Sequence, residues 1–202
     1  MNKFISNNQF LLGSASPRRL DLLNQIGINP DLVDAPNIDE TNLKKELPLN
    51  YVKRMAIEKS LILQPKYKNS IIITADTVVA LGRRILPKTT DVKMAEDCLR
   101  MISGRRHKVL TSFALYSPNK TLKVKTVVSL VKFKRLHNEE IKYYLETNEW
   151  NGKAGGYAIQ GVAASFINFI SGSYSNVMGL PLAELYRALL SIGYQFKNAK
   201  QN

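Results

Sequence analysis

Residues 11–23 read LLGSASPRRLDLL: the end of an apolar strand, a short polar turn and the start of a helix. Ser16 is a good N-cap, and Pro17 suits the first helical position. A helix N-terminus already carries partial positive charge, so the adjacent cations Arg18 and Arg19 conflict with their position. An anion resolves this conflict, because free N–H groups, two hydroxyls and two guanidiniums converge there. The stretch therefore predicts a phosphate site, unless both arginines point into solvent.

The same alternation of apolar strands and amphipathic helices continues along the 202 residues, and no repeat or linker divides them. The predicted strands are FLLG, IIITADTVVAL, KVLTSFALY and KVKTVVSLVKF. The predicted helices cover 16–26, 50–63, 91–103, 138–147 and 181–192. Hairpin signals at LGRRI and SPNKT imply antiparallel pairs. The expected fold class is α/β, with a mixed sheet flanked by helices.

A formal net charge of +13 favours anionic partners such as nucleotides, nucleic acid or an acidic surface, without choosing among them. The lone Cys98 cannot form an internal disulfide, and two histidines are too few for a zinc cluster of thiolates and imidazoles. The composition is still compatible with a hard metal ion bound by oxygen ligands. The N-terminal MNKFISNNQFLLG lacks a secretory pattern and no window approaches 18 apolar residues, so we expect a cytoplasmic protein.

A single carboxylate, Asp76, interrupts the otherwise apolar run at residues 71–81, IIITADTVVAL. Burying an unpaired charge is costly, so Asp76 needs a cation, a metal, a helix end or an opening onto a cleft. A structural salt bridge meets this need, and so does a role as metal ligand or general base. Thr77 adds a further hydrogen-bonding group beside it.

The helix predicted over residues 50–63 has the opposite problem, a cation on an apolar face. Val52, Ala56 and Leu63 share one face of this helix, at helical spacing. Lys59 lies on that same face. Such a lysine is paired, reaches into a site, or extends its ammonium to the surface.

Two further segments are rich in polar groups. NIDET places Asp39 and Glu40 in a predicted loop, where solvation is the default explanation, although a carboxylate pair also suits Mg²⁺. Residues 153–161, KAGGYAIQG, contain three glycines that let a ligand approach the backbone closely. Gln160 carries both a donor and an acceptor for a base edge. The Walker and Gly-x-Gly-x-x-Gly nucleotide motifs are absent.

Eight motifs, in one order over residues 10 to about 192, resemble the Maf family of nucleoside triphosphate pyrophosphatases: SASPRR, IDE, RMAIEKS, ADTVV, ILPKTTD, ISGRRHKVLTS, KAGGYAIQG and GSYSNVMGLPL. The resemblance implies that residues 1–202 form a single Maf-like nucleotide pyrophosphatase domain. The implied fold is two-lobed and inosine-triphosphatase-like, with a deep central cleft, and the implied assembly is a homodimer. The implied reaction is metal-assisted hydrolysis of a nucleoside triphosphate to the monophosphate and pyrophosphate, with Mg²⁺ or Mn²⁺, as a nucleotide-pool house-cleaning enzyme.

The resemblance also implies roles for individual residues. Asp76 matches the family's proton acceptor. Asp76 and Glu40 are the implied metal-binding pair. Either residue could accept the proton or hold the metal. Arg18, Thr77 and Gln160 match positions associated with substrate selection. The other residues that match positions in the cleft are Ser14, Arg19, Glu40, Lys59 and Lys88.

The KAGGYAIQG and GSYSNV motifs are similar to the branch of the family that acts on dTTP and UTP, which favours a pyrimidine substrate. A purine or modified-nucleotide pyrophosphatase of the same fold is the alternative enzyme. A basic nucleic-acid-binding module is the non-enzymatic alternative; it explains the charge but leaves Asp76 and the glycine-rich motifs unexplained. On the favoured interpretation neither nucleic acid nor a membrane is a required partner.

One segment departs from the family pattern. The family usually has Leu-Gly-Lys-Pro where this chain has Leu86-Pro87-Lys88-Thr89. Pro87 fixes its own φ, lacks an N–H and restricts Leu86 to extended conformations. Lys88 therefore matches the family's lysine by position, but the sequence does not predict the direction of its side chain.

Overall fold

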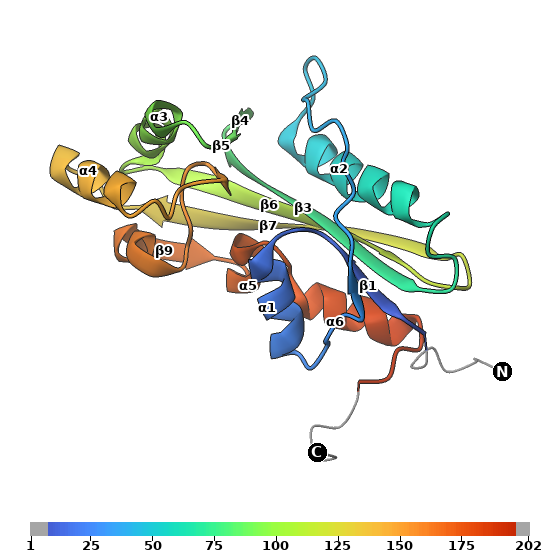
Figure 1. Ribbon diagram of the computed structural model, residues 1–202. Coiled ribbons are helices and arrows are strands. Elements are labelled where there is room, and N and C mark those ends of the chain that lie inside the picture. Colours follow the sequence, from blue (N-terminus) through green and yellow to red (C-terminus); the bar gives the residue numbers. More distant parts are fainter. Residues whose placement is uncertain (1–7, 197–202) are drawn as a thin grey trace.

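A long mixed β-sheet forms the centre of the computed structural model, which describes residues 8–196 (Figure 1). Its strand order is β2-β1-β3-β6-β7-β9, with β4 pairing on β3. β1 pairs in parallel with β2 and β3, and the remaining pairs are antiparallel. The strands are β1 (Phe10–Gly13), β2 (Leu32–Val33), β3 (Ile71–Leu81), β4 (Arg84–Leu86), β6 (Arg106–Tyr116), β7 (Leu122–Phe133) and β9 (Ile167–Ser171).

Helices cover both faces of this sheet. In Figure 1, α2 lies over one face while α1, α5 and α6 lie on the other. The helices are α1 (Pro17–Gln25), α2 (Pro48–Leu63), α3 (Val92–Ile102), α4 (Asn138–Glu146), α5 (Tyr174–Met178) and α6 (Leu182–Ser191), with a 3₁₀ helix η1 (Gly161–Phe166). A separate two-stranded ribbon pairs β5 (Lys88–Thr89) with β8 (Lys153–Ala154).

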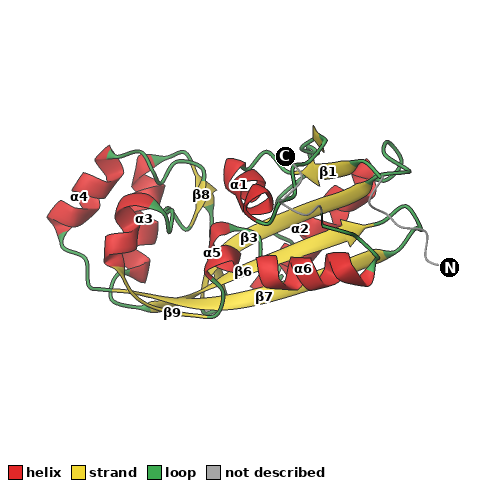
Figure 2. Cartoon of the chain, turned by 90° about the horizontal axis from the view of Figure 1, so that it is seen from below, coloured by secondary structure: helices red, strands yellow, loops and turns green. Residues whose placement is uncertain are grey.

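The long strands β3, β6 and β7 join two groups of elements, as Figure 2 shows. Helices α3 and α4 gather with β8 at one end of these strands, and α1, α6 and β1 lie toward the other. Apolar side chains from both groups form the largest core cluster, which includes Leu12, Phe113, Phe133, Tyr144 and Leu189. A smaller cluster packs α2 on β3 and β6. The predicted two-lobed α/β class with a mixed sheet is confirmed.

The five predicted helices and four predicted strands are all present, with helix ends within two residues of those expected. Both predicted hairpins form, between β3 and β4 and between β6 and β7. Sequence periodicity missed β2, β5, β8, β9, α5 and η1, because elements this short contain too few residues to show a period.

Within residues 8–196, no helix is long and apolar enough to cross a membrane. The expectation of a cytoplasmic protein rests in part on the N-terminal stretch MNKFISNNQFLLG. The first seven residues of this stretch lie outside the described residues.

Candidate functional site

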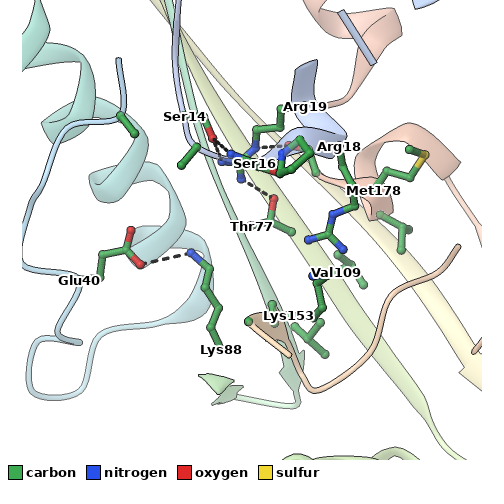
Figure 3. A pocket seen from close by; sticks show the side chains of 18 of the residues that line it. Ser14, Ser16, Arg18, Arg19, Glu40, Thr77, Lys88, Val109, Lys153 and Met178 are labelled. Atoms are coloured by element: carbon green, nitrogen blue, oxygen red, sulfur yellow. Dashed lines mark hydrogen bonds and ion pairs between the residues drawn. The ribbon is translucent and has the colours of Figure 1, made fainter. Parts of the chain in front are cut away.

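A cavity of about 460 Å³ opens where the turn between β1 and α1, the strand β3, the ribbon β5–β8 and α5 meet (Figure 3). One part of its wall is polar and charged, and another part is apolar. The polar wall includes Ser14, Ser16, Arg18, Arg19, Glu40, Lys59, Thr77, Lys88 and Lys153. The apolar wall includes Val79, Val109, Ala154, Tyr157, Ile159, Val177 and Met178.

The two arginines at the start of α1 have different surroundings. Arg19 is buried, and its Nε donates to the carbonyl oxygen of Gly179 at 2.9 Å. Its Nη1 donates to Ser14 Oγ at 2.8 Å and its Nη2 to Thr77 Oγ1 at 3.1 Å. Burial lowers the pKa of Arg19, opposed by the nearby charge of Asp76. This guanidinium therefore fastens the β1–α1 turn to β3 and to the end of α5 through neutral acceptors.

Arg18 lines the cavity and is partly buried, and its side chain forms no hydrogen bond or ion pair with any residue of 8–196. Burial lowers the pKa of its guanidinium. Ser16 is the N-cap of α1 in its backbone conformation, as predicted, and Pro17 follows it, but the Ser16 hydroxyl makes no capping bond. Both arginines therefore line the cavity rather than point into bulk solvent, but only the Arg19 side chain is held by hydrogen bonds within residues 8–196.

Two carboxylates and two ammoniums form a connected group at one side of the cavity, here called the carboxylate–lysine cluster: Glu40, Lys59, Asp76 and Lys88. Lys59 Nζ lies 2.6 Å from Glu40 Oε1 and 2.8 Å from Asp76 Oδ1. Lys88 Nζ lies 3.2 Å from Glu40 Oε2 and 3.2 Å from Asp76 Oδ1. Among the alternatives left open for Asp76 and Lys59, the structure shows an ion pair between the two residues.

Asp76 is completely buried and stays ionised at neutral pH. Burial opposes its ionisation, but Lys88, Lys59 and Arg19 together hold its pKa below the ordinary value. Asp76 does not itself line the cavity, whereas Lys59 and Lys88 do, so the two ammoniums separate the carboxylate from the open space. Within the described chain, Asp76 Oδ2 has no hydrogen-bond partner.

Pro87 does not turn Lys88 away from the site. β5 pairs with β8 so that Lys88 lies opposite Ala154, and the Gly155 N–H donates to the Pro87 carbonyl oxygen at 3.1 Å. Pro87 thus contributes its carbonyl to the ribbon, where its missing N–H is not required. The departure from the family pattern leaves Lys88 in the carboxylate–lysine cluster.

Gln160 lies apart from the other predicted residues. Its side chain is exposed at the start of η1 and is not among the residues that line the cavity. From the same segment, Lys153, Tyr157 and Ile159 line the cavity instead. The segment therefore lines the cavity, but through residues that the sequence did not single out, because the irregular backbone after β8 has no period that predicts side-chain direction.

Tyr157 is held by a buried histidine behind the cavity wall. His107 Nε2 and Tyr157 Oη are 2.8 Å apart, and both rings pack edge-on against Phe133. Burial lowers the pKa of His107 to about 4 and raises the pKa of Tyr157. Within residues 8–196, His107 Nδ1 has no hydrogen-bond partner. His107 is therefore neutral at physiological pH.

This buried histidine predicts a loss of stability in mild acid. Between pH 6.5 and about 4 the unfolded chain binds a proton at His107 that the native chain excludes. The free energy of unfolding should therefore fall as the pH decreases across this range, by up to ~3 kcal/mol from this group. Urea unfolding of wild type and His107→Gln at several pH values measures the effect, and the variant should have the shallower slope. Equal slopes for wild type and His107→Gln would contradict the assignment.

The chain is similar in sequence to known proteins over most of its length. Residues 9–192 match a family described as Maf-like protein. A dTTP/UTP pyrophosphatase of Rhodospirillum rubrum is 50% identical over 190 residues, which cover 94% of this chain and 90% of that protein. A dTTP/UTP pyrophosphatase of Zymomonas mobilis is 52% identical over 187 residues, 93% of each. Among solved structures, the Ham1 protein of Staphylococcus aureus aligns with a TM-score of 0.45 at 16% identity, covering 62% of this chain and 72% of that one.

Proposed function

The chain belongs to the Maf family, and on that premise we propose that it hydrolyses nucleoside triphosphates to the monophosphate and pyrophosphate, with dTTP and UTP as the favoured substrates. The observation that carries the proposal is the cavity, which combines five cations with an apolar wall and has the buried, ionised Asp76 paired to two of those cations. The names of the two relatives, each about half identical to this chain, support the choice of substrate.

The division of the cavity wall fits the two parts of a nucleotide. The apolar side chains, among them Val109, Tyr157 and Met178, provide a surface for a base. The charged side carries Arg18, Arg19 and the lysines, which suit a chain of phosphates. A triphosphate lying along the cavity would bring its phosphates toward the carboxylate–lysine cluster.

Asp76 is the proposed proton acceptor for the water that attacks the α-phosphorus, with pyrophosphate as the leaving group. Its low pKa keeps the carboxylate ionised and ready to take a proton. Since Lys59 and Lys88 separate Asp76 from the cavity, at least one ammonium must shift to let a water molecule reach the carboxylate. Arg19, fixed by three neutral acceptors, would contribute positive charge without reorganising.

A divalent cation, Mg²⁺ or Mn²⁺, is also part of the proposal. Asp76 and Glu40 are the residues that would hold it. Both carboxylates contact Lys59, so they lie close together, and Asp76 Oδ2 has no hydrogen-bond partner within the described chain. Two carboxylates suit Mg²⁺ that is otherwise bound by water and substrate phosphates. No group of three or more His, Cys, Asp or Glu side chains that could hold a metal occurs in residues 8–196. When bound, the cation would polarise a phosphoryl oxygen and activate water.

The proposed reaction is tested with a panel of nucleoside triphosphates. We expect dTTP and UTP to release pyrophosphate in the presence of Mg²⁺ or Mn²⁺, with chelation by EDTA abolishing the reaction. Purine and modified nucleotides in the panel examine the alternative substrates. Orthophosphate as the first product would show that a different bond is cleaved, and no product from any nucleotide would contradict the proposed activity.

The homodimer implied by the family resemblance remains a proposal. Light scattering of the purified chain at several concentrations measures its mass directly. A mass near 22.8 kDa, that of one chain, would contradict it.

A further inference from the structure

The cations that line the cavity differ in the partners of their charged groups. In the carboxylate–lysine cluster, two ammoniums meet two carboxylates, so the cluster is balanced without a ligand. Arg19 donates to three neutral acceptors, which fix its position but do not cancel its charge. Within residues 8–196, Arg18 and Lys153 line the cavity without an ion pair to any carboxylate. Among the cavity cations without a carboxylate partner, Arg19 is already fixed by three hydrogen bonds, so Arg18 and Lys153 are the two whose charged groups are left to bind an anionic substrate.

The fold places Lys153 on the opposite face of the ribbon from Lys88. β8 pairs with β5 so that Lys153 lies opposite Thr89 and Ala154 lies opposite Lys88. Directly opposite residues share a face and successive residues alternate, so Lys88 and Lys153 project from different faces. Figure 3 shows the result: Lys88 points toward Glu40, and Lys153 points toward Arg18.

Arg18 and Lys153 disfavour each other's charge. Burial lowers the pKa of Lys153, and the charge of Arg18 lowers it further. The hydrogen bond that Lys153 Nζ makes is to the neutral Asn151 carbonyl oxygen, at 3.0 Å. A bound anion would remove the repulsion and accept charge-assisted hydrogen bonds from both side chains.

We propose that Arg18 and Lys153 form the phosphate-binding pair of this cavity, and that Lys153 is a substrate-binding residue. The inference rests on the proposed function and deepens it, since the ligand is a phosphate group of the substrate's polyphosphate chain. The inference also assigns different roles to the cations of the cavity. Arg18 and Lys153 bind phosphate, while Lys59 and Lys88 chiefly hold Asp76 and Glu40.

Binding of inorganic triphosphate tests the pair without requiring turnover. Calorimetry in the absence of metal would compare wild type with Lys153→Met, Lys153→Gln and Lys153→Arg. We expect Lys153→Met and Lys153→Gln to bind at least about tenfold more weakly, because each loses a charge-assisted contact, and Lys153→Arg to retain most of the affinity. The exposed Lys68 gives the matched control, since Lys68→Met removes the same charge outside the cavity and should bind like wild type.

Kinetics distinguish phosphate binding from recognition of the base. If Lys153 binds phosphate, Lys153→Gln lowers kcat/KM for UTP and dTTP by the same factor. A change in the UTP-to-dTTP ratio with unaltered triphosphate binding would overturn the inference in favour of base recognition. Wild-type affinity in both Lys153→Met and Lys153→Gln would also overturn it. A wild-type protein that binds triphosphate through Lys153 but hydrolyses no nucleotide would support the inference while the proposed function fails.

Discussion

Asp76→Asn is expected to lower the turnover of dTTP by about 10² to 10⁴ and to leave the protein folded. The asparagine keeps the shape of the side chain but cannot take the proton of the attacking water or bind a divalent cation strongly. Folding should persist, because the substitution also removes the cost of burying a carboxylate. Lys59 keeps Glu40 as an ionised partner at 2.6 Å.

Turnover and the thermal midpoint would be measured on the same preparation of Asp76→Asn. Asp21→Asn is the matched control, since Asp21 is exposed on α1 and should have wild-type turnover. Unfolding of Asp76→Asn would assign Asp76 a mainly structural role. A folded variant with near-normal turnover would remove Asp76 from the mechanism.

Lys59→Met is expected to lower the free energy of unfolding at pH 7 by about 3 kcal/mol, because it removes the buried partner of a buried carboxylate. The Lys59 side chain is 10% exposed and that of Asp76 is fully buried, so water cannot replace the lost ion pair. Lys88→Met is the matched control, since it removes an ammonium from the same two carboxylates. The Lys88 side chain is 40% exposed, so this loss should be below about 1 kcal/mol. Urea unfolding measures both.

The effect of Lys59→Met should depend on pH. The pKa of Asp76 in the folded chain lies below its ordinary value of 3.8, so the stabilisation that Asp76 gains is present above that pH. It is lost as the pH falls and the folded carboxyl takes up a proton. The difference between wild type and Lys59→Met should therefore shrink in acid. Equal losses for Lys59→Met and Lys88→Met at pH 7 would contradict the dominant role of the buried pair.

The sequence by itself determined the α/β class, the five longer helices and the four longer strands. These elements are long enough for periods of two or 3.6 residues to show which side chains are buried, and the local turn signals mark their ends. The sequence also determined that Asp76 and Lys59 need partners, because a charge among buried apolar residues is costly wherever it lies. Most of the predicted cavity residues follow from this kind of local conflict together with the motif resemblance.

Only the tertiary structure decided which groups meet. Arg18 and Arg19 are adjacent in the sequence, yet Arg19 donates to the carbonyl oxygen of Gly179, 160 positions away, whereas the Arg18 side chain lines the cavity without a partner in residues 8–196. Lys153 enters the site because a two-residue strand pairs with β5, and Gln160 lies outside the lining because the irregular backbone beyond that strand turns it outward. Such contacts depend on long-range packing and on the direction of single side chains, neither of which leaves a periodic signal in the sequence.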